Sequence, residues 1–370
     1  MNAMIKKLLQ GQAVEWKTLG EVANLNRGRV MSKTYLADNI GEYPVYSSQT
    51  ANNGEIGKIN TFDFEGEFIT WTTDGANAGT VFYRNEKFSI TNVCGLITLK
   101  YDYLTYKFLF YWLSIQAKKH VYSGMGNPKL MSNQMEKIQI PIPPLSVQSQ
   151  IVQILDTFTE LTEQLTAELS MRQKQYQYYR DFLLSEHELA KVGFEWKSLG
   201  ELGIINRGKR VIKNQLTTEG SYPVYQNSLQ PLGYFDKFNV KANTTFMITA
   251  GAAGEIGYSN CAFWSADDCY YFDCPKDVLD NRFLYHSLKK QQNKIFSQVR
   301  KASIPRLGRN SVENIKIPIP PLSVQSQIVA ILDTFDVLTQ SISDGLPKEI
   351  QLRQKQYEYY RELLLGFPMI

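Results

Sequence analysis

The feature that most constrains this chain is a segment of 19 residues, IPIPPLSVQSQIVQILDTF, that occurs twice. Residues 140–158 return as residues 317–335 with 18 of 19 positions identical. Residues 15–29 and 195–209, the opening segments, also repeat and share nine of fifteen positions. The period of about 180 residues is far longer than that of solenoid repeats. The sequence therefore predicts a tandem duplication of one domain and its following helix.

Each repeat begins with a proline-rich strap, residues 140–144 and 317–321. Because proline has no amide hydrogen, the strap cannot be an inner strand, and it predicts an extended lead into a helix with Ser146 as N-cap. Apolar residues then recur in steps of three and four on one helix face, at 147, 151, 154, 158, 161 and 165. Each helix should run for about forty residues, roughly 55 to 60 Å. A long helix with one apolar seam needs a partner, and the simplest partner is the other copy.

The second long helix carries an insertion. The straps are 177 residues apart, whereas the RQKQY segments at 172–176 and 353–357 are 181 apart, so residues 344–347 are extra. Four residues keep the apolar seam in register. Gly345 and Pro347 disfavour a helix, which predicts a kink or short break near residues 343–347.

Length and composition limit the class of protein. With 370 residues, 43% of them hydrophobic, the chain can form two cored domains. It has no run of eighteen apolar residues and no signal peptide, which predicts a cytoplasmic protein without a membrane partner. Four cysteines without a CxxC pair and only three histidines predict no metal site, so we interpret Cys94, Cys261, Cys269 and Cys274 as packing or surface residues.

Between each opening segment and its strap, the sequence predicts short strands and one helix, an α+β pattern. The helices are expected at residues 104–119 and 281–294, and a short lead helix within residues 1–14. Glycine loops at 75–79 and 251–254 indicate either tight turns or places where another backbone approaches closely. A further loop precedes each strap, at residues 126–130 and 303–307.

Basic residues gather at the same place in both copies. Residues 282–316 hold nine Lys or Arg against one acid, and residues 105–139 hold five against one. The net charge of +4 is modest, so a nucleic-acid surface depends on such clusters. A charge cluster often marks only a solvated face, but its recurrence in both copies favours a phosphate-contacting surface.

The two copies do not agree evenly. The straps, long helices and opening segments match closely, whereas residues 30–130 and 210–307, the readers, match only at scattered turn and strand positions. Drift of a nonfunctional surface would also have blurred the straps. The pattern therefore indicates one scaffold that carries two different readers.

The doubled strap, the helices ending RQKQYQYYRDFLL and RQKQYEYYRELLL, the LGE openings and the GNPKL-type loops carry a resemblance. Over essentially its whole length, the chain resembles the specificity subunit of a type I restriction-modification system. The resemblance implies an α+β fold with two pseudo-symmetric target-recognition domains, separated by two long antiparallel helices that form a coiled-coil-like spacer. The implied segments are residues 1–140 and 193–317 for the domains, and 141–192 and 318–370 for the straps with their helices.

The resemblance also implies the function. Each domain would read one half of an asymmetric bipartite site in double-stranded DNA, and the helices would set the spacer and dock two methyltransferase subunits, to which two restriction and translocase subunits add. S-adenosylmethionine, ATP and Mg²⁺ would belong to those partners. The residues agree, because the sequence has no GxxxxGK[ST] phosphate loop, no Asn-Pro-Pro-aromatic motif and no Pro-Asp dipeptide. We therefore expect a non-catalytic subunit without cofactor or metal.

Lysine, arginine and backbone amides anchor phosphates, and polar side chains read base edges. Lys129, Arg306 and Arg309 in the pre-strap loops are the first candidates for contact with DNA. We expect phosphate contacts from Lys118, Lys119, Lys289, Lys290, Arg300 and Lys301. Arg27, Arg29, Arg207, Lys209 and Arg210 follow the opening segments and either approach a groove or form structural ion pairs.

Two other classes stay open on the sequence alone. A catalytic methyltransferase or nuclease would transfer methyl groups or cut DNA as the isolated chain. A duplicated protein-binding scaffold would lack salt-dependent affinity for duplex DNA, because that dependence arises from phosphate contacts.

Overall fold

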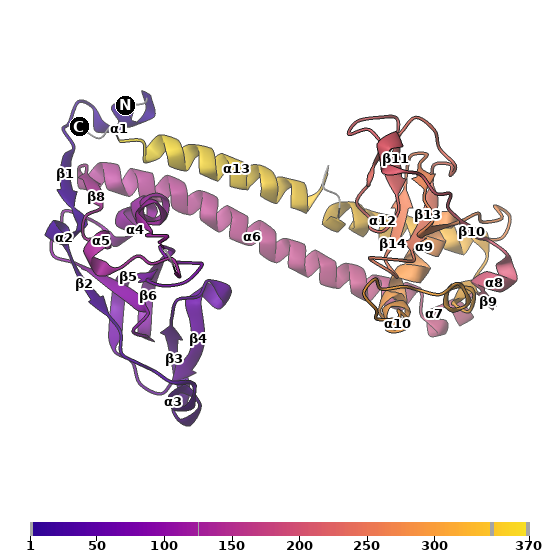
Figure 1. Ribbon diagram of the computed structural model, residues 1–370, viewed down its shortest axis with the longest axis horizontal. Helices are drawn as coiled ribbons and strands as arrows, with labels where there is room; N and C mark the ends of the chain where they lie inside the picture. Colours follow the sequence, from indigo (N-terminus) through magenta and orange to yellow (C-terminus); the bar gives the residue numbers. More distant parts are fainter. Residues whose placement is uncertain (1–2, 125, 341–343, 368–370) are drawn as a thin grey trace. The chain divides into compact units, whose positions relative to one another are not determined.

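The computed structural model describes residues 3–124, 126–340 and 344–367. It divides into two compact units, Met1–Glu163 with Gln351–Ile370 (unit 1) and Gln164–Ile350 (unit 2). Figure 1 labels their elements. Each unit holds the reader of one copy, the first part of that copy's long helix and the last part of the other copy's helix.

Unit 1 is built on a six-stranded sheet in the order β2-β7-β5-β6-β3-β4, antiparallel except where β3 meets β6. The strands are β2 (Ala23–Arg27), β3 (Ile40–Tyr46), β4 (Glu55–Ile59), β5 (Phe64–Thr72), β6 (Val81–Ile90) and β7 (Cys94–Leu99). Besides the long helices, unit 1 holds α1 (Ala3–Leu9), α2 (Leu19–Val22), α3 (Lys33–Asp38), α4 (Tyr106–Gln116) and α5 (Ser132–Met135). On β5, Ile69 and Trp71 pack with Phe108 of α4, whereas Phe68 packs with Phe88 in a second cluster. This alternation follows from the two-residue period of a strand.

Unit 2 repeats this plan in two sheets. The order β10-β16-β13-β14 corresponds to β2-β7-β5-β6, and β12-β11-β15 keeps the parallel contact that β3 makes with β6. The strands are β10 (Ile205–Arg207), β11 (Tyr222–Tyr225), β12 (Gly233–Phe235), β13 (Thr244–Ile248), β14 (Ile256–Ser259), β15 (Trp264–Ser265) and β16 (Cys269–Phe272). The short helices are α7 (Glu186–Ala190), α8 (Leu199–Leu202), α9 (Asn281–Lys290), α10 (Gln292–Ser297) and α11 (Arg309–Glu313). The expected α+β class, the lead helix and the helix of each reader are confirmed, although the second helix continues after residue 290 as a separate short one.

Each strap pairs with the opening segment of its own copy. β8 (Gln139–Ile142) lies antiparallel to β1 (Glu15–Thr18), and β17 (Lys316–Ile319) lies antiparallel to β9 (Glu195–Ser198). Both sheets have two strands, so the expectation that a proline strap is not an inner strand is confirmed. The sequence did not predict the pairing itself. This pairing explains why the strap and the opening segment both match between the two copies.

A buried glutamine joins each strap to its reader. Gln148 is 0% exposed, and its side chain accepts from Thr105 N and donates to Tyr103 O and Pro143 O. Gln325 makes the corresponding three bonds in unit 2. Because every bond of this amide lies inside the protein, loss of either glutamine would leave several backbone groups unpaired.

The prediction that Ser146 is an N-cap is wrong. Helix α6 (Leu145–Leu183) begins one residue earlier, and the amides of Val147 and Gln148 both donate to Pro144 O, at 2.9 and 3.0 Å. The proline before the helix has no amide to satisfy, so its carbonyl fills the capping position and Ser146 lies exposed within the first turn.

The long helices pair antiparallel inside each unit. In unit 1, Phe158 near the start of α6 stacks on Tyr360 near the end of α13 (Leu346–Leu364), with ring centroids 5.2 Å apart. In unit 2, Phe335 of α12 (Leu322–Gln340) stacks in the same way on Tyr179 at 5.3 Å. The predicted seam and its partner are therefore confirmed.

The predicted break in the second copy is also present, because α12 ends at Gln340 and α13 begins at Leu346. Gly345 has a φ of 83°, a left-handed conformation that side chains disfavour. Residues 341–343 lie outside the described residues. Within the described chain, no helix is long and apolar enough to cross a membrane.

The duplicated aspartate of the QILDTF and AILDTF segments holds each reader helix to its long helix. In unit 1, Asp156 accepts from Lys107 Nζ at 2.5 Å and Tyr111 Oη at 2.6 Å. In unit 2, Asp333 accepts from Arg282 Nε and His286 Nε2, both at 2.7 Å. Arg282 also reaches Asp336 at 2.6 Å, and these carboxylates raise its pKa although burial alone would lower it.

Candidate nucleic-acid interface

In unit 1, the glycine loop and the pre-strap loop lie against each other. Gly75 N donates to Pro128 O at 3.0 Å, and Leu130 N donates to Thr73 O at 2.9 Å. Gly75 has a φ of 88°, so the loop is a tight turn, and an added Cβ there would meet nothing within 4 Å. The close backbone approach occurs at Gly79, where an added Cβ would lie 3.2 Å from Lys118 Cα. Two loops that the sequence analysis singled out separately therefore form one structure.

A β-turn between β6 and β7 completes this group of loops. Cys94 N donates to Thr91 O at 2.9 Å, which closes the turn, and Thr73 N donates to Val93 O at 3.2 Å. We call residues 73–79, 91–94, 122–124 and 126–130 the loop cluster of unit 1.

Residues 249–254, 266–269 and 300–307 form the loop cluster of unit 2 with the same backbone bonds. These bonds join Gly251 N to Pro305 O (3.1 Å), Leu307 N to Thr249 O (2.8 Å), Thr249 N to Asp268 O (2.8 Å) and Cys269 N to Ala266 O (3.0 Å). Two readers with little sequence in common thus share one backbone framework at this place.

The pre-strap loops are hairpins closed by equivalent residue pairs. Tyr122 and Lys129 exchange backbone hydrogen bonds in unit 1, and Arg300 and Arg306 do so in unit 2. Lys129 and Arg306 therefore occupy the same position, as the sequence comparison expected. Both side chains are exposed.

The two side chains differ in their partners. Lys129 Nζ lies 3.7 Å from Asp74 Oδ1. In unit 1, Asp74 forms the backbone bridge to Lys129, and in unit 2, Ala250 forms the bridge to Arg306. Arg306 therefore has no carboxylate at the position where Lys129 has one. Among the described residues, the Arg306 guanidinium forms no hydrogen bond or ion pair, which leaves all its donors available to a ligand.

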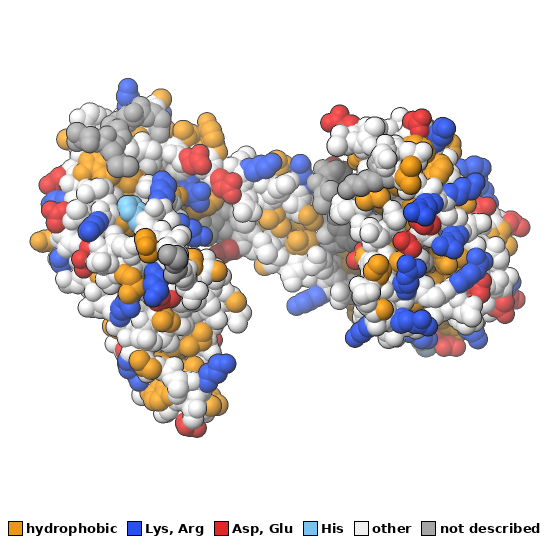
Figure 2. Space-filling view, in the orientation of Figure 1, with side chains coloured by type: hydrophobic (Ala, Val, Ile, Leu, Met, Phe, Trp, Pro, Cys, Tyr) orange, Lys and Arg blue, Asp and Glu red, His pale blue; other side chains and the backbone are white. Residues whose placement is uncertain are grey.

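Four of the predicted arginines line one hollow of about 640 Å³ in unit 2. Besides Arg306 these are Arg300, Arg207 and Arg309. Arg207 Nε donates to Asp267 O at 3.1 Å. Arg309 pairs with Glu313 at 2.7 Å, and this hydrogen bond raises the pKa of Arg309. Figure 2 shows Lys and Arg side chains spread over the visible face of unit 2, with acidic side chains among them.

The remaining candidates after the opening segments separate into two groups. In unit 1, Arg27 Nη2 contacts Met131 Sδ at 2.9 Å, next to the pre-strap loop. Arg29 instead donates to Tyr35 and Asp63, and these bonds raise its pKa. Of the two alternatives for Arg29, the structure therefore shows the structural ion pair. In unit 2, Lys209 and Arg210 are exposed.

The lysines that follow the reader helices also divide. Lys118 and Lys119 in unit 1 and Lys301 in unit 2 are exposed. Lys289 and Lys290 are half-buried, and burial lowers the pKa of both. Lys290 Nζ donates to Leu184 O at 2.7 Å, at the end of α6. Lys290 is thus tied to the end of the long helix, whereas the exposed Lys119 donates to Gln116, three residues before it, at 3.1 Å.

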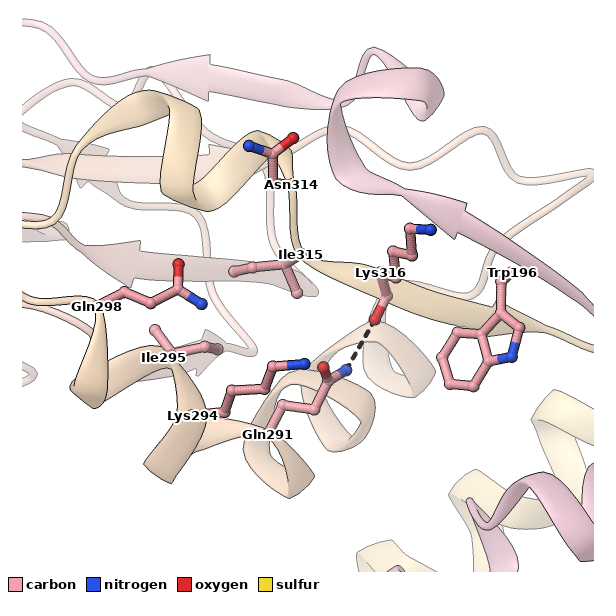
Figure 3. A pocket seen from close by; sticks show the side chains of 8 residues that line it. All are labelled: Trp196, Gln291, Lys294, Ile295, Gln298, Asn314, Ile315 and Lys316. Carbon is pink, nitrogen blue, oxygen red and sulfur yellow. Dashed lines mark hydrogen bonds between the residues drawn. The ribbon is translucent and has the colours of Figure 1, made fainter.

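A second hollow of unit 2, of about 450 Å³, adjoins the first and is drawn in Figure 3. Trp196 stands at one side, and Gln291 Nε2 donates to Lys316 O at 2.9 Å. In unit 1, Trp112 packs edge-on against Trp16 and donates to Gln139 O. The second copy has Ser287 at the helix position of Trp112, and Trp196 is 45% exposed.

Gln298 lines both hollows, so they are neighbouring parts of one surface, to which the second adds Lys294 and Lys316. The sequence analysis did not single out these two lysines individually, although both lie in its basic segment. The candidates predicted from the sequence are all cations, so they do not include the central residues of the β-turns, Asn92–Val93 and Asp267–Asp268. Alignment of Cys94 with Cys269 would have revealed them.

The described residues contain no group of three or more His, Cys, Asp or Glu that could hold a metal ion. Cys94 and Cys269 are buried beside the β-turns, and burial raises the pKa of both thiols to about 12. A thiol with so high a pKa is protonated near neutral pH and acts as a packing group.

Comparison with known proteins agrees with the duplication. The model of the type I restriction modification DNA specificity domain matches residues 13–171 and 191–352, once in each copy. A putative type I specificity subunit of Mycoplasma pneumoniae is 35% identical over 93% of this chain and 95% of its own length. A putative type I restriction enzyme specificity subunit of Haemophilus influenzae is 36% identical over 99% of both chains. The EcoR124I/EcoR124II specificity subunit of Escherichia coli is 33% identical over 98% and 97%.

The fold agrees as well. The crystal structure of a type I restriction-modification S subunit from M. genitalium superposes with a TM-score of 0.70 over 97% of both chains, at 19% identity. A chain from a structure of the assembly of a type I system gives a TM-score of 0.53 over 96% of this chain and 98% of its own. The chain belongs to the specificity subunits of type I restriction-modification systems. It is a DNA sequence specificity subunit with two specificity domains.

Proposed function

We propose that each unit reads its own half of an asymmetric bipartite site in double-stranded DNA through its loop cluster. The observation that carries this proposal is the shared framework: the same backbone hydrogen bonds present different exposed side chains in the two units. Lys129, Arg306, Arg300, Arg207 and Arg309 are the central contacts. The other exposed candidates, Lys118, Lys119, Lys301, Arg27, Lys209 and Arg210, would reach flanking phosphates.

In this proposal residues 1–140 and 193–317 are the target-recognition domains, and the straps with their long helices connect them. The chain itself catalyses no reaction. Two methyltransferase subunits dock on it, and two restriction and translocase subunits join them. The partners supply S-adenosylmethionine, ATP and Mg²⁺, and the assembly acts on DNA in the cytoplasm.

Exposed apolar residues on the long helices support the docking of two identical partners. Met171, Tyr178 and Phe182 are 49, 64 and 43% exposed along one face of α6. Leu352 and Tyr359 occupy the corresponding places on α13 and are 43 and 61% exposed. Exposed apolar stripes mark protein contacts, and a stripe on each helix suits one copy of a partner on each.

The proposal is tested by mapping methylated adenines in a host that carries this chain with its methyltransferase subunits. We expect one bipartite motif. Exchange of residues 30–130 for the domain of a relative should change one half of the motif and leave the other unaltered. A change in both halves, or binding to duplex DNA that does not weaken with salt, would favour a protein-binding scaffold instead.

The long helices would set the length of the unread spacer. In a continuous helix four residues would be worth about 6 Å, nearly two base pairs, but residues 344 and 345 lie in the break before α13, so only Leu346 and Pro347 add helix, about 3 Å. Removal of residues 344–347 should therefore shorten the spacer or prevent assembly, with both half-sites kept. A changed half-site with the spacer unchanged would contradict this role.

A further inference from the structure

The β-turn of unit 2 carries a carboxylate that has no partner. Asp267 and Asp268 are its two central residues, between Ala266 and Cys269. Within the described chain, the Asp267 side chain forms no hydrogen bond or ion pair, and its Oδ1 is shut off from solvent without a donor. An unpaired buried acceptor costs about 1 to 3 kcal/mol, so its presence requires an explanation.

The surroundings of Asp267 indicate a ligand. Asp267 is half-buried and lines the hollow formed by Arg207, Arg300, Arg306 and Arg309. Its own carbonyl accepts from Arg207, which fixes the turn next to that guanidinium. The second dihedral angle of aspartate is broad, so either carboxylate oxygen can turn toward the hollow while the backbone stays in place.

An acceptor supplies what the arginines cannot. Guanidinium groups donate to phosphates and to guanine O6 and N7, but they cannot accept from a base. The major-groove edges of cytosine and adenine each present an exocyclic amino group, N4 or N6, which donates. A carboxylate facing DNA repels phosphates, and the four arginines offset that repulsion.

We propose that Asp267 reads one base of the second half-site by accepting a hydrogen bond from the amino group of a cytosine or adenine. This rests on the proposed function and adds a specificity-determining residue to it. Asn92 holds the equivalent turn position in unit 1, where it is exposed. The Asn92 side-chain amide has both a donor and an acceptor, so it can form two hydrogen bonds with adenine, whereas the Asp267 carboxylate only accepts. The two turns therefore read different bases in this proposal.

The test uses the full chain with its methyltransferase subunits, once the wild-type motif is known. Binding is measured for duplexes in which each position of the motif is replaced in turn. Asp267→Ala should lose about tenfold to hundredfold discrimination at one position of the second half-site. The first half-site and the slope of affinity against salt should stay unchanged. Replacing the amino-bearing base at that position by a base without the amino group, in wild type, should reproduce the loss and identify cytosine or adenine.

Asp268→Ala is the matched control, because it removes the same charge from the neighbouring residue, which lines the same hollow but has no buried oxygen without a donor. It should alter all duplexes about equally. Asp267→Asn keeps the shape of the side chain and guards against a folding defect, and it should change the preferred base at the same single position. Equal discrimination by Asp267→Ala and wild type at every position would overturn the inference. So would an equal effect of the two alanine variants. A wild-type chain without any bipartite motif would instead overturn the proposed function.

Discussion

The two loop clusters have the same skeleton and different surfaces. Backbone hydrogen bonds join the glycine loop, the β-turn and the pre-strap hairpin in the same way in both units. The side chains on that framework differ: Lys129 against Arg306, Asn92 against the half-buried Asp267, and Tyr122 against Arg300. Because backbone hydrogen bonds hold the framework, its side chains can differ between the units while the fold stays intact.

The largest difference is the state of the equivalent cations. Lys129 is paired with Asp74, whereas Arg306 forms no side-chain bond within the described chain. A cation that is already paired must give up part of that interaction when it meets a phosphate or a base. The unpaired one keeps the full interaction for the ligand.

Arg306→Ala should therefore weaken DNA binding more than Lys129→Ala does. For Arg306 we expect a loss of about tenfold to hundredfold, confined to one position if it contacts a base. Titrations of duplex DNA at several salt concentrations measure both effects, because a lost phosphate contact weakens all sequences alike and lowers the salt slope by about one. Unchanged affinity and specificity in both variants would remove the pre-strap hairpin from the interface.

Asp74→Ala should make unit 1 resemble unit 2. Removal of the carboxylate frees Lys129, and we expect DNA affinity to rise about twofold to fivefold, the range of an exposed ion pair. The gain should disappear in the double variant Asp74→Ala with Lys129→Ala, and a binding titration at low salt is the suitable measurement. A gain of the same size without Lys129 would mean that Asp74 acts only through its charge.

The junction between reader helix and long helix predicts a difference in pH dependence. Burial lowers the pKa of His286, although its hydrogen bond to Asp333 raises it in part. The folded unit therefore binds this proton less readily than the unfolded chain. The contribution of His286 to the free energy of unfolding is fully present above the ordinary pKa of 6.5, and it is lost as the pH falls below that value. Tyr111 fills the same place in unit 1 and does not titrate in that range, since burial raises its pKa.

Hydrogen exchange of the full chain can measure this difference. Between pH 7.5 and 5.5, α9 should lose protection in wild type relative to His286→Gln at the same pH, because glutamine cannot take up the proton. Helix α4 serves as the internal control and should behave alike in both proteins. Equal losses of protection in α9 of the two proteins would show that His286 does not control the stability of unit 2.

Much of the scaffold could be predicted from the sequence because the duplication itself marks what the fold needs. The seam, the break at residues 344–345 and the equivalence of Lys129 with Arg306 follow from spacing alone. Contacts between segments far apart in the sequence could not be predicted in this way. The strap pairs with a segment more than a hundred residues away, and Gln148 donates to Tyr103 O. Alignment of Cys94 with Cys269 marks the two β-turns, but the pair Asp267-Asp268 between strands resembles an ordinary turn, and only the structure shows that Asp267 Oδ1 is buried without a donor.

A further effect is expected at Ser287, whose place on α9 corresponds to Trp112 on α4. Its hydroxyl is buried and has no hydrogen-bond partner within the described chain, and the residue is 1% exposed. Ser287→Ala removes an unpaired polar group and improves helix propensity, so it should stabilise α9 by about 1 kcal/mol.

Ser114 of α4 offers a matched control for that change, because its hydroxyl donates to Tyr111 O at 2.7 Å. Ser114→Ala loses a satisfied bond and should leave the stability of α4 unchanged or lower it by up to about 1 kcal/mol. Native-state hydrogen exchange of the two helices compares the variants within one protein. If Ser287→Ala lowered the protection of α9, the Ser287 hydroxyl would have a hydrogen-bond partner, such as a bound water. The difference between the two reader helices at this position would then lie in hydrogen bonding and not in packing.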